Sequence, residues 1–139
     1  MPAAGIPQWG MPLQFQPRAG SVVICDFRGF EKPEMVKRRP VIVVAANQRN
    51  YRLVTIVPLS TTIPRRPLPW HYPLADPIPS LAGGRVVWAK CDLLYTVSTA
   101  RLEKVRVGPN RLATLQIDER DYLGICAAVL AGLRLAPSP

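Results

Sequence analysis

Apolar runs of strand length alternate with polar or proline-containing turns over most of the chain. Residues 21–27 (SVVICDF), 41–46 (VIVVAA) and 53–59 (LVTIVPL) are rich in β-branched side chains, which is typical of buried strands. The polar segment 47–50 (NQRN) is a turn signal between the second and third runs. The pattern therefore predicts three strands, the last two of them joined as a hairpin.

The next part of the chain is dominated by proline. Residues 63–79 contain six prolines, and proline lacks the amide hydrogen that a residue in a central strand donates. We therefore expect an extended surface loop or a short edge segment there. Residues 85–94 (RVVWAKCDLL) form a further strand-like run, and residues 97–107 have room for one or two more short strands.

Near residue 118 the apolar period changes from that of a strand to that of a helix. Asp118 is suited to cap a helix, and Glu119 and Asp121 place acidic groups in its first turn. The apolar residues that then recur at helical spacing are Tyr122, Cys126, Val129, Leu130 and Leu133. The predicted fold class is mainly β, a small curled antiparallel sheet or barrel with this C-terminal helix packed on it.

The length of 139 residues fits a single domain. Residues 1–18 mix proline, glycine and glutamine without a period, which predicts a flexible N-terminal arm before a domain over 19–135 and a tail over 136–139. No apolar stretch approaches the roughly 20 residues of a membrane span, and no signal-peptide pattern opens the chain. We therefore expect a cytoplasmic protein with no membrane partner.

The charge balance points to the class of partner. Eighteen Lys and Arg against nine Asp and Glu give a net charge of +9, which favours nucleic acid because phosphate neutralisation and counterion release drive such binding. Cys25, Cys91 and Cys126 lack CxxC spacing or a histidine cluster, so neither a disulfide framework nor a zinc site is indicated. We expect neither a metal nor a cofactor.

Polar side chains stand at the ends of the predicted strands. Pro40 restricts Arg39 to extended conformations, so Arg38 and Arg39 are expected to point to opposite sides of the strand that begins there. Which of the two faces a site stays open at this point. The run 53–59 is followed by the hydroxyls of residues 60–62 (STT), which can donate to phosphate oxygens.

Strand alternation divides residues 87–93 into two faces. Val87, Ala89, Cys91 and Leu93 form the inward set. The outward set consists of Trp88, Lys90 and Asp92, which could stack a base, meet a phosphate and accept a base-edge hydrogen bond. A solvated salt pair between Lys90 and Asp92 is the alternative. For His71, the only histidine, packing within the loop or stacking on RNA is favoured over acid–base catalysis.

Four short motifs in this order resemble the PemK/MazF ribonuclease toxins. They are residues 20–27 (GSVVICDF), the Arg39-Pro40 pair before an apolar strand, residues 57–61 (VPLST), and residues 90–92 (KCD) before a closing helix. The resemblance covers about residues 18–133 and implies an SH3-like barrel and a homodimer. It also implies metal-independent cleavage of single-stranded RNA, such as mRNA, at short sequences by 2′-hydroxyl attack, and neutralisation by an acidic antitoxin segment.

The resemblance also implies roles for individual residues. Arg39 corresponds to the catalytic arginine of the Arg-Pro pair, and Glu34 falls where some members place a carboxylate that acts as base. Ser60 and Thr61 match a hydroxyl pair, and Asp92 matches the aspartate of an Arg-Cys-Asp motif in which Lys90 here replaces arginine, so that bidentate phosphate contact is lost. The residues expected to contact RNA are Lys37, Arg38, His71, Trp88 and Lys90.

Two other classes of function stay open. A non-catalytic, SH3-like regulator that binds RNA or DNA would need the basic face without the set formed by Glu34, Arg39, Ser60, Thr61 and Asp92. The second alternative is a protein–protein module that docks through its proline-rich loop. It explains the prolines but not the positions of the hydroxyl and carboxylate side chains. Retention of the complete set therefore favours the ribonuclease.

Overall fold

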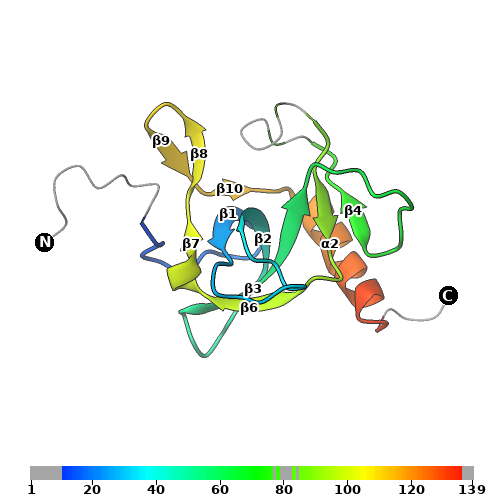
Figure 1. Cartoon of the computed structure of the whole chain (residues 1–139), viewed down its shortest axis with the longest axis horizontal. Helices are drawn as coiled ribbons and strands as arrows, with labels where there is room; N and C mark the ends of the chain where they lie inside the picture. Colours follow the sequence, from blue (N-terminus) through cyan, green and yellow to red (C-terminus); the bar gives the residue numbers. More distant parts are fainter. Residues whose placement is uncertain (1–10, 77, 79–82, 84, 136–139) are drawn as a thin grey trace, which may run out of the picture.

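Most of the strands form one strongly curled antiparallel sheet, and the C-terminal α-helix lies against one end of it (Figure 1). The computed structural model describes residues 11–76, 78, 83 and 85–135. The elements along the chain are β1 (Ser21–Asp26), β2 (Arg38–Ala46), β3 (Leu53–Ser60), β4 (His71–Pro73), β5 (Trp88–Lys90), β6 (Tyr95–Ser98), the 3-10 helix η2 (Thr99–Arg101), β7 (Leu102–Glu103), β8 (Val105–Gly108), β9 (Arg111–Ala113), β10 (Leu115–Gln116) and α2 (Glu119–Gly132).

The order of the strands explains the curl of the sheet. Along its main path the order is β10-β1-β2-β3-β5-β4, while β6 also pairs with β3 and β7 with β1. On its edge away from β2, β1 therefore pairs with two short strands, β10 and β7. In the same way β3 pairs with β5 and β6 on its edge away from β2. The result is a half-barrel, the mainly β class that the sequence predicts, and the separate β8–β9 hairpin projects from it (Figure 1).

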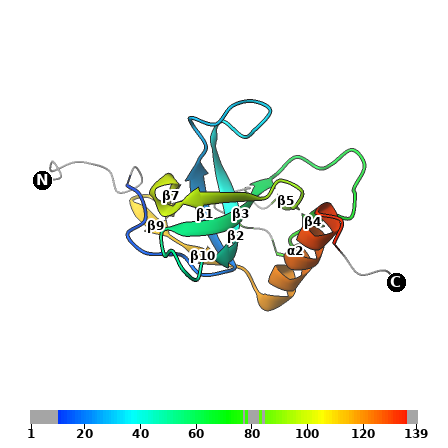
Figure 2. The same cartoon turned by 90° about the horizontal axis from the view of Figure 1, so that it is seen from below.

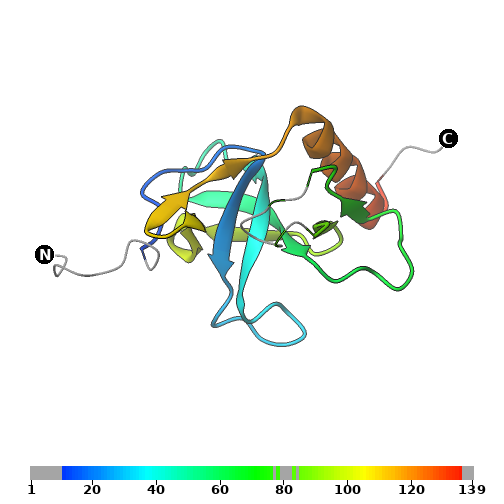
Figure 3. The same cartoon turned by 90° about the horizontal axis from the view of Figure 1, so that it is seen from above.

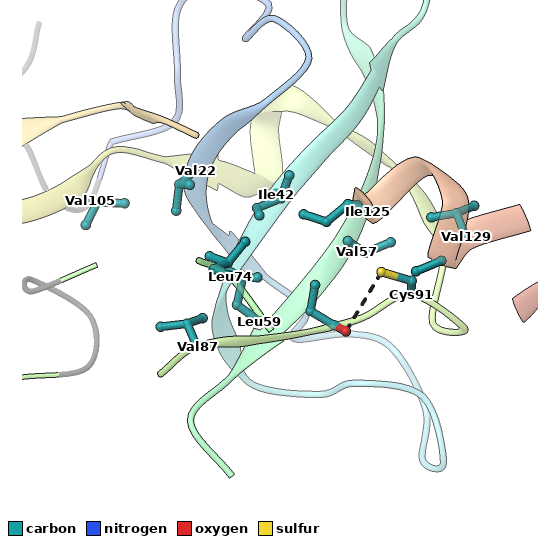
Figure 4. Close-up of a cluster of buried hydrophobic side chains, with 12 residues drawn as sticks. Val22, Ile42, Val57, Leu59, Leu74, Val87, Cys91, Val105, Ile125 and Val129 are labelled. Atoms are coloured by element: carbon teal, nitrogen blue, oxygen red, sulfur yellow. Dashed lines mark hydrogen bonds between the residues drawn. The ribbon is translucent and has the colours of Figure 1, made fainter. Parts of the chain in front are cut away.

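The three long strands are buried on both faces. One apolar cluster lies under α2 (Figure 4) and includes Val22, Ile42, Val57, Leu59 and Ile125. The cluster on the other face includes Val23, Cys25, Phe27, Val41 and Val43. Two buried faces require continuous apolar runs rather than strict alternation, so the runs at 21–27, 41–46 and 53–59 are confirmed as β1, β2 and β3.

The start of α2 is as predicted, whereas its inner face is not. Asp118 caps the helix, its Oδ1 accepting from the Asp121 amide at 2.8 Å. Leu130 and Leu133 belong to the apolar set predicted at helical spacing, yet they are 42% and 47% exposed. Between residues 122 and 132 the helix has no charged side chain, so no polar stripe marks the outer side. The buried apolar residues are Ile125, Ala128 and Val129.

Two tyrosines attach α2 to the sheet. A bulge in β2 leaves Val44 out of the ladder with β3, and its carbonyl accepts from the Tyr122 hydroxyl at 2.6 Å. Asp121, which is 3% exposed, accepts from the Tyr72 hydroxyl at 2.7 Å and from the Ala75 amide at 3.1 Å. Burial, followed by this bond to Asp121, raises the pKa of Tyr72 to about 12. Asp121 therefore fixes β4 against the helix (Figures 2 and 3).

The proline-rich segment forms β4, which ends the strand order of the described sheet beside β5 and so confirms the expected edge position. The single strand predicted over residues 85–94 is wrong in its length, because only Trp88–Lys90 pair. The chain turns directly afterwards, with the Leu93 amide donating to the Lys90 carbonyl at 3.1 Å. A new strand, β6, then begins at Tyr95 and pairs with Leu53–Ile56 of β3, whereas β5 pairs with Leu59 and Ser60 at the end of β3.

Residues 11–18 differ from the flexible arm expected for residues 1–18. The Leu13 amide donates to the Leu102 carbonyl at 2.8 Å, and the Leu13 side chain lies in the core at 7% exposure. Gln16 Nε2 donates to the Leu53 carbonyl at 3.1 Å. This packing depends on partners far along the chain, so no local pattern of apolar residues predicts it. Residues 1–10 and the expected tail 136–139 lie outside the described residues.

Substitution of Gly124 tests how tightly β4 and α2 pack. An added Cβ would lie 2.2 Å from Tyr72 Cε1, so we expect Gly124→Ala to lower the free energy of unfolding by about 1–3 kcal/mol through overpacking. Helix propensity alone would raise it by about 1 kcal/mol. Urea denaturation decides the sign, and a rise in stability contradicts the packing. In a Tyr72→Ala background, where the ring is absent, the same change should stabilise.

Candidate functional site

The ends of β2, β3 and β5 present one continuous row of side chains. The pairing of β2 with β3 sets Val41 opposite Pro58, and by strand alternation Arg39 lies on the face of Val41 and Ser60 on the face of Pro58. Ser60 in turn pairs with Trp88 of β5. Residues opposite each other in an antiparallel ladder point to the same face, so Arg39, Ser60 and Trp88 share one face.

A cleft of about 180 Å³ opens beside this row. Its lining consists of Arg39, Pro40, Leu59, Ser60, Thr61, Thr62 and Val87. The Thr62 amide donates to Ser60 Oγ at 3.1 Å, which fixes the turn that carries the hydroxyls. The cleft thus combines one guanidinium and three hydroxyl side chains with three apolar residues. Guanidinium and hydroxyl donors bind phosphate oxygens.

The structure decides between the two neighbouring arginines. Arg38 pairs with Asp26 in the β1–β2 register and forms an ion pair with Glu103 of β7. Arg39 instead lines the cleft, and within the described part of the chain it makes no ion pair. The prediction that the two side chains point to opposite sides is confirmed. Arg39 therefore offers an uncompensated positive charge to the cleft.

The opposite face also carries arginines, each of which already has a partner. Asp26 accepts from Arg28 Nε at 2.9 Å and from Arg28 Nη2 at 2.6 Å. This hydrogen bonding by Arg28 lowers the pKa of Asp26 to about 2. Arg38 pairs with Glu103 as well, and Arg101 donates to two backbone carbonyls, so the guanidinium groups of this face are already engaged.

A second row of polar side chains adjoins the first. His71 pairs with Lys90 across β4 and β5, which places both on the face of Trp88. His71 Nδ1 accepts from the Leu68 amide at 3.0 Å, so a neutral imidazole carries its hydrogen on Nε2. This second row supplies a cation and a ring donor beside the indole of Trp88.

The inward set predicted for β5 is confirmed for three of its four members. Val87, Ala89 and Cys91 are buried, whereas Leu93 is only half-buried. The Cys91 thiol contacts the Ala89 carbonyl at 3.8 Å (Figure 4), and burial raises its pKa to about 12. Cys91 is therefore a core residue with an unreactive thiol.

The two candidate carboxylates lie away from the cleft. Glu34 is exposed in the loop between β1 and β2, and its Oε1 accepts from the Glu31 amide at 2.8 Å. Asp92 is exposed in the turn after β5, where its backbone packs against Gly132 at the end of α2. Lys37 is exposed at the end of the same loop as Glu34. Across the described residues, no group of three His, Cys, Asp or Glu could hold a metal ion.

Thr62, the last of the three hydroxyl residues noted at 60–62, also lines the cleft. One residue with a part in this arrangement, Arg101, was not singled out by the sequence. Arg101 contacts the loop that carries Glu34 across about seventy residues of sequence. No local pattern could identify Arg101, because its partners are backbone carbonyls brought close by the fold.

Comparison with known families decides the identity of the chain. Residues 18–128 match the family described as PemK-like, MazF-like toxin of type II toxin-antitoxin system. This match spans most of the protein. The chain belongs to the PemK/MazF toxin family. It is also 28% identical over 117 residues to the Escherichia coli K12 protein YifN, covering 69% of this chain and 78% of YifN.

Solved structures of family members share the fold. An endoribonuclease from a mycobacterial species, solved in complex with its cognate antitoxin, is 25% identical, with a TM-score of 0.61 and coverage of 88% of this chain and 99% of that chain. MazF from Deinococcus radiodurans is 19% identical with a TM-score of 0.63, covering 87% and 99%. The second likeness concerns the fold alone. No helix in the described ranges is long and apolar enough to cross a membrane.

The pKa of Asp26 tests the charge network behind Arg38. We expect Arg28→Ala to raise the pKa of Asp26 from about 2 towards the ordinary value near 3.9. A carboxyl group with a lowered pKa stabilises the fold at pH values above its ordinary pKa. This contribution to stability is therefore lost as the pH falls from about 4 through 2. A pH titration of the carboxyl carbon by NMR measures the shift. Identical midpoints in wild type and variant would contradict the assigned contact.

Proposed function

We propose that this protein is a metal-independent endoribonuclease that cuts single-stranded mRNA at specific short sequences and acts in the cytoplasm as the toxin of a toxin–antitoxin pair. The observation that carries the proposal is the cleft in which Arg39, Ser60 and Thr61 meet, in a chain of the PemK/MazF family. A net charge of +9 supports a polyanionic substrate.

The reaction we propose is intramolecular transesterification. The ribose 2′-oxygen attacks phosphorus, the 5′-oxygen of the next nucleotide leaves, and the products are a 2′,3′-cyclic phosphate and a 5′-hydroxyl. This step needs a base at the 2′-hydroxyl, a proton donor at the 5′-oxygen and cationic donors around the phosphorane, and none of these requires a metal.

The cleft supplies the donors for the phosphorane. Arg39 would stabilise the charge that develops on the phosphate oxygens, since it faces the cleft and has no ion pair within the described residues. Ser60 and Thr61 would hold the same phosphate through their hydroxyls. A guanidinium is a poor proton donor because of its high pKa, so Arg39 acts mainly through charge.

Glu34 is our choice for the base, with Asp92 in reserve. In the structure the Glu34 carboxylate accepts from the Glu31 amide within its own loop. Its use as base therefore requires the segment 31–34, between Phe30 and Met35, to move so that the carboxylate reaches the 2′-hydroxyl at the cleft. Asp92 would need a similar approach from the turn beside α2. RNA binding would have to drive either rearrangement.

The face beside the cleft suits the bases of the RNA. Trp88 would stack on a base, Lys90 would meet a phosphate as a point charge, and His71 Nε2 would donate to a base edge or phosphate. Arg38 and Lys37 would add longer-range attraction from the start of β2 and the loop before it. These contacts would select the sequence that is cut.

The same cleft is our proposed site for an acidic antitoxin segment. A mycobacterial endoribonuclease of the same fold has been solved in complex with its cognate antitoxin. Carboxylates of such a segment would pair with Arg39 and Lys90, which lie on one face. Antitoxin and RNA would therefore exclude each other.

We also propose a homodimer formed through the outer side of α2. Leu123, Leu130 and Leu133 are 58%, 42% and 47% exposed there, and a helix that is apolar on both sides is normally buried on both. We expect a mass near twice 15.4 kDa by light scattering, and Leu130→Glu should halve it. Tyr51→Glu, at a residue 71% exposed in the β2–β3 turn, is the matched control. A monomeric wild type would contradict the dimer.

The experiment that tests the proposed activity is incubation with a long single-stranded RNA in excess EDTA. We expect discrete fragments from the wild type, and a rate about 10²–10³-fold lower for Arg39→Ala because a charge donor at the transition state is lost. Arg49→Ala removes the same charge from an exposed turn residue and should cut at the wild-type rate.

Two outcomes would count against the proposal. Intact RNA with clear retardation on a gel would favour the non-catalytic regulator, which shares the fold and the basic face. An Arg39→Ala protein that folds and cuts as fast as the wild type would remove Arg39 from the site, whatever the remaining activity.

A further inference from the structure

The β1–β2 loop (residues 27–37) projects from the sheet and carries Glu34 (Figures 2 and 3). Most of its side chains are exposed, so few contacts determine where it lies. Those contacts come mainly from two residues on the segment that follows β5, Tyr95 and Arg101.

Arg101 of η2 makes three contacts, one with the end of β1 and two with the first part of the loop. Its Nη1 donates to the Asp26 carbonyl at 3.0 Å and to the Arg28 carbonyl at 2.9 Å. Its guanidinium carbon also lies 4.5 Å from the centre of the Phe30 ring. A planar guanidinium can make in-plane hydrogen bonds and a cation–π contact at the same time, which an ammonium group cannot reproduce.

Tyr95 of β6 anchors the second part of the loop. Its hydroxyl oxygen accepts from the Met35 amide at 3.2 Å. Its ring lies 5.2 Å from that of Phe27 and 5.8 Å from that of Phe30 between centroids. The aromatic cluster therefore links the anchor at Met35 to the ring on which Arg101 rests. Glu34, next to Met35, lies between the two anchors.

We propose that Arg101 is a positioning residue that holds the first part of the β1–β2 loop in place, so that the segment carrying Glu34 moves towards the cleft from a fixed point. It contacts one carbonyl at the end of β1 and one carbonyl and one ring of the loop, and it does not line the cleft of Arg39. Its effect on RNA cleavage rests on the proposed function, with Glu34 as the base. Its effect on the position of the loop does not.

Hydrogen exchange tests the placement of the loop without reference to activity. We expect Arg101→Met to speed amide exchange in residues 28–35 by about tenfold, since two hydrogen bonds from a charged group are lost. Arg101→Lys, which keeps the charge, should give an intermediate increase, and β2 and β3 should exchange as in the wild type. Arg49→Met is the matched control. Unchanged exchange in the loop of Arg101→Met overturns the proposal.

A double-mutant cycle on cleavage tests whether Arg101 acts through Glu34. In the wild-type background, Arg101→Met should lower kcat about tenfold and change KM less than about twofold. In a Glu34→Gln background, the same substitution should lower kcat by less than about a further twofold. Fully additive losses would overturn the link to Glu34. Absence of cleavage by the wild type would refute the proposed function, while the exchange experiment would still decide the role of Arg101 in the loop.

Discussion

The pairing of β2 between β1 and β3 is the constraint on which the rest of the structure depends. Both faces of these strands are buried in apolar clusters, so a slip of one residue would turn Val41 and Val43 to the wrong cluster. The same slip would exchange Arg38 and Arg39. Core packing therefore decides which arginine meets Ser60 in the cleft and which meets Glu103 behind it.

The parts of the fold that depend on local pattern could be predicted from the sequence. β1, β2 and β3 are continuous apolar runs because both their faces are buried. The Asp118 cap and the proline-rich edge strand β4 follow from the chemistry of single residues. Ser60 and Thr61 could be placed in the cleft because they directly follow a strand whose extent was evident.

The remaining features depend on contacts between distant segments. α2 has no polar stripe after Asp121, so the sequence could not tell its buried Ile125 from its exposed Leu130. Glu34 lies five residues before Arg39 in sequence, yet the loop folds it back onto Glu31 and away from the cleft. Leu13 lies in the core, where its amide donates to the Leu102 carbonyl of β7, a residue far along the chain. Tertiary packing therefore determines which of these side chains are buried and where the loop lies.

The central claim is that the cleft of Arg39 promotes attack by a 2′-hydroxyl. The most direct measurement uses an RNA with one mapped cleavage position in which only the nucleotide 5′ to the scissile phosphate is made 2′-deoxy. We expect this linkage to stay intact in excess EDTA while the unmodified RNA is cut to a 2′,3′-cyclic phosphate. Cleavage of the deoxy linkage at an equal rate would contradict it, because the nucleophile would then come from elsewhere.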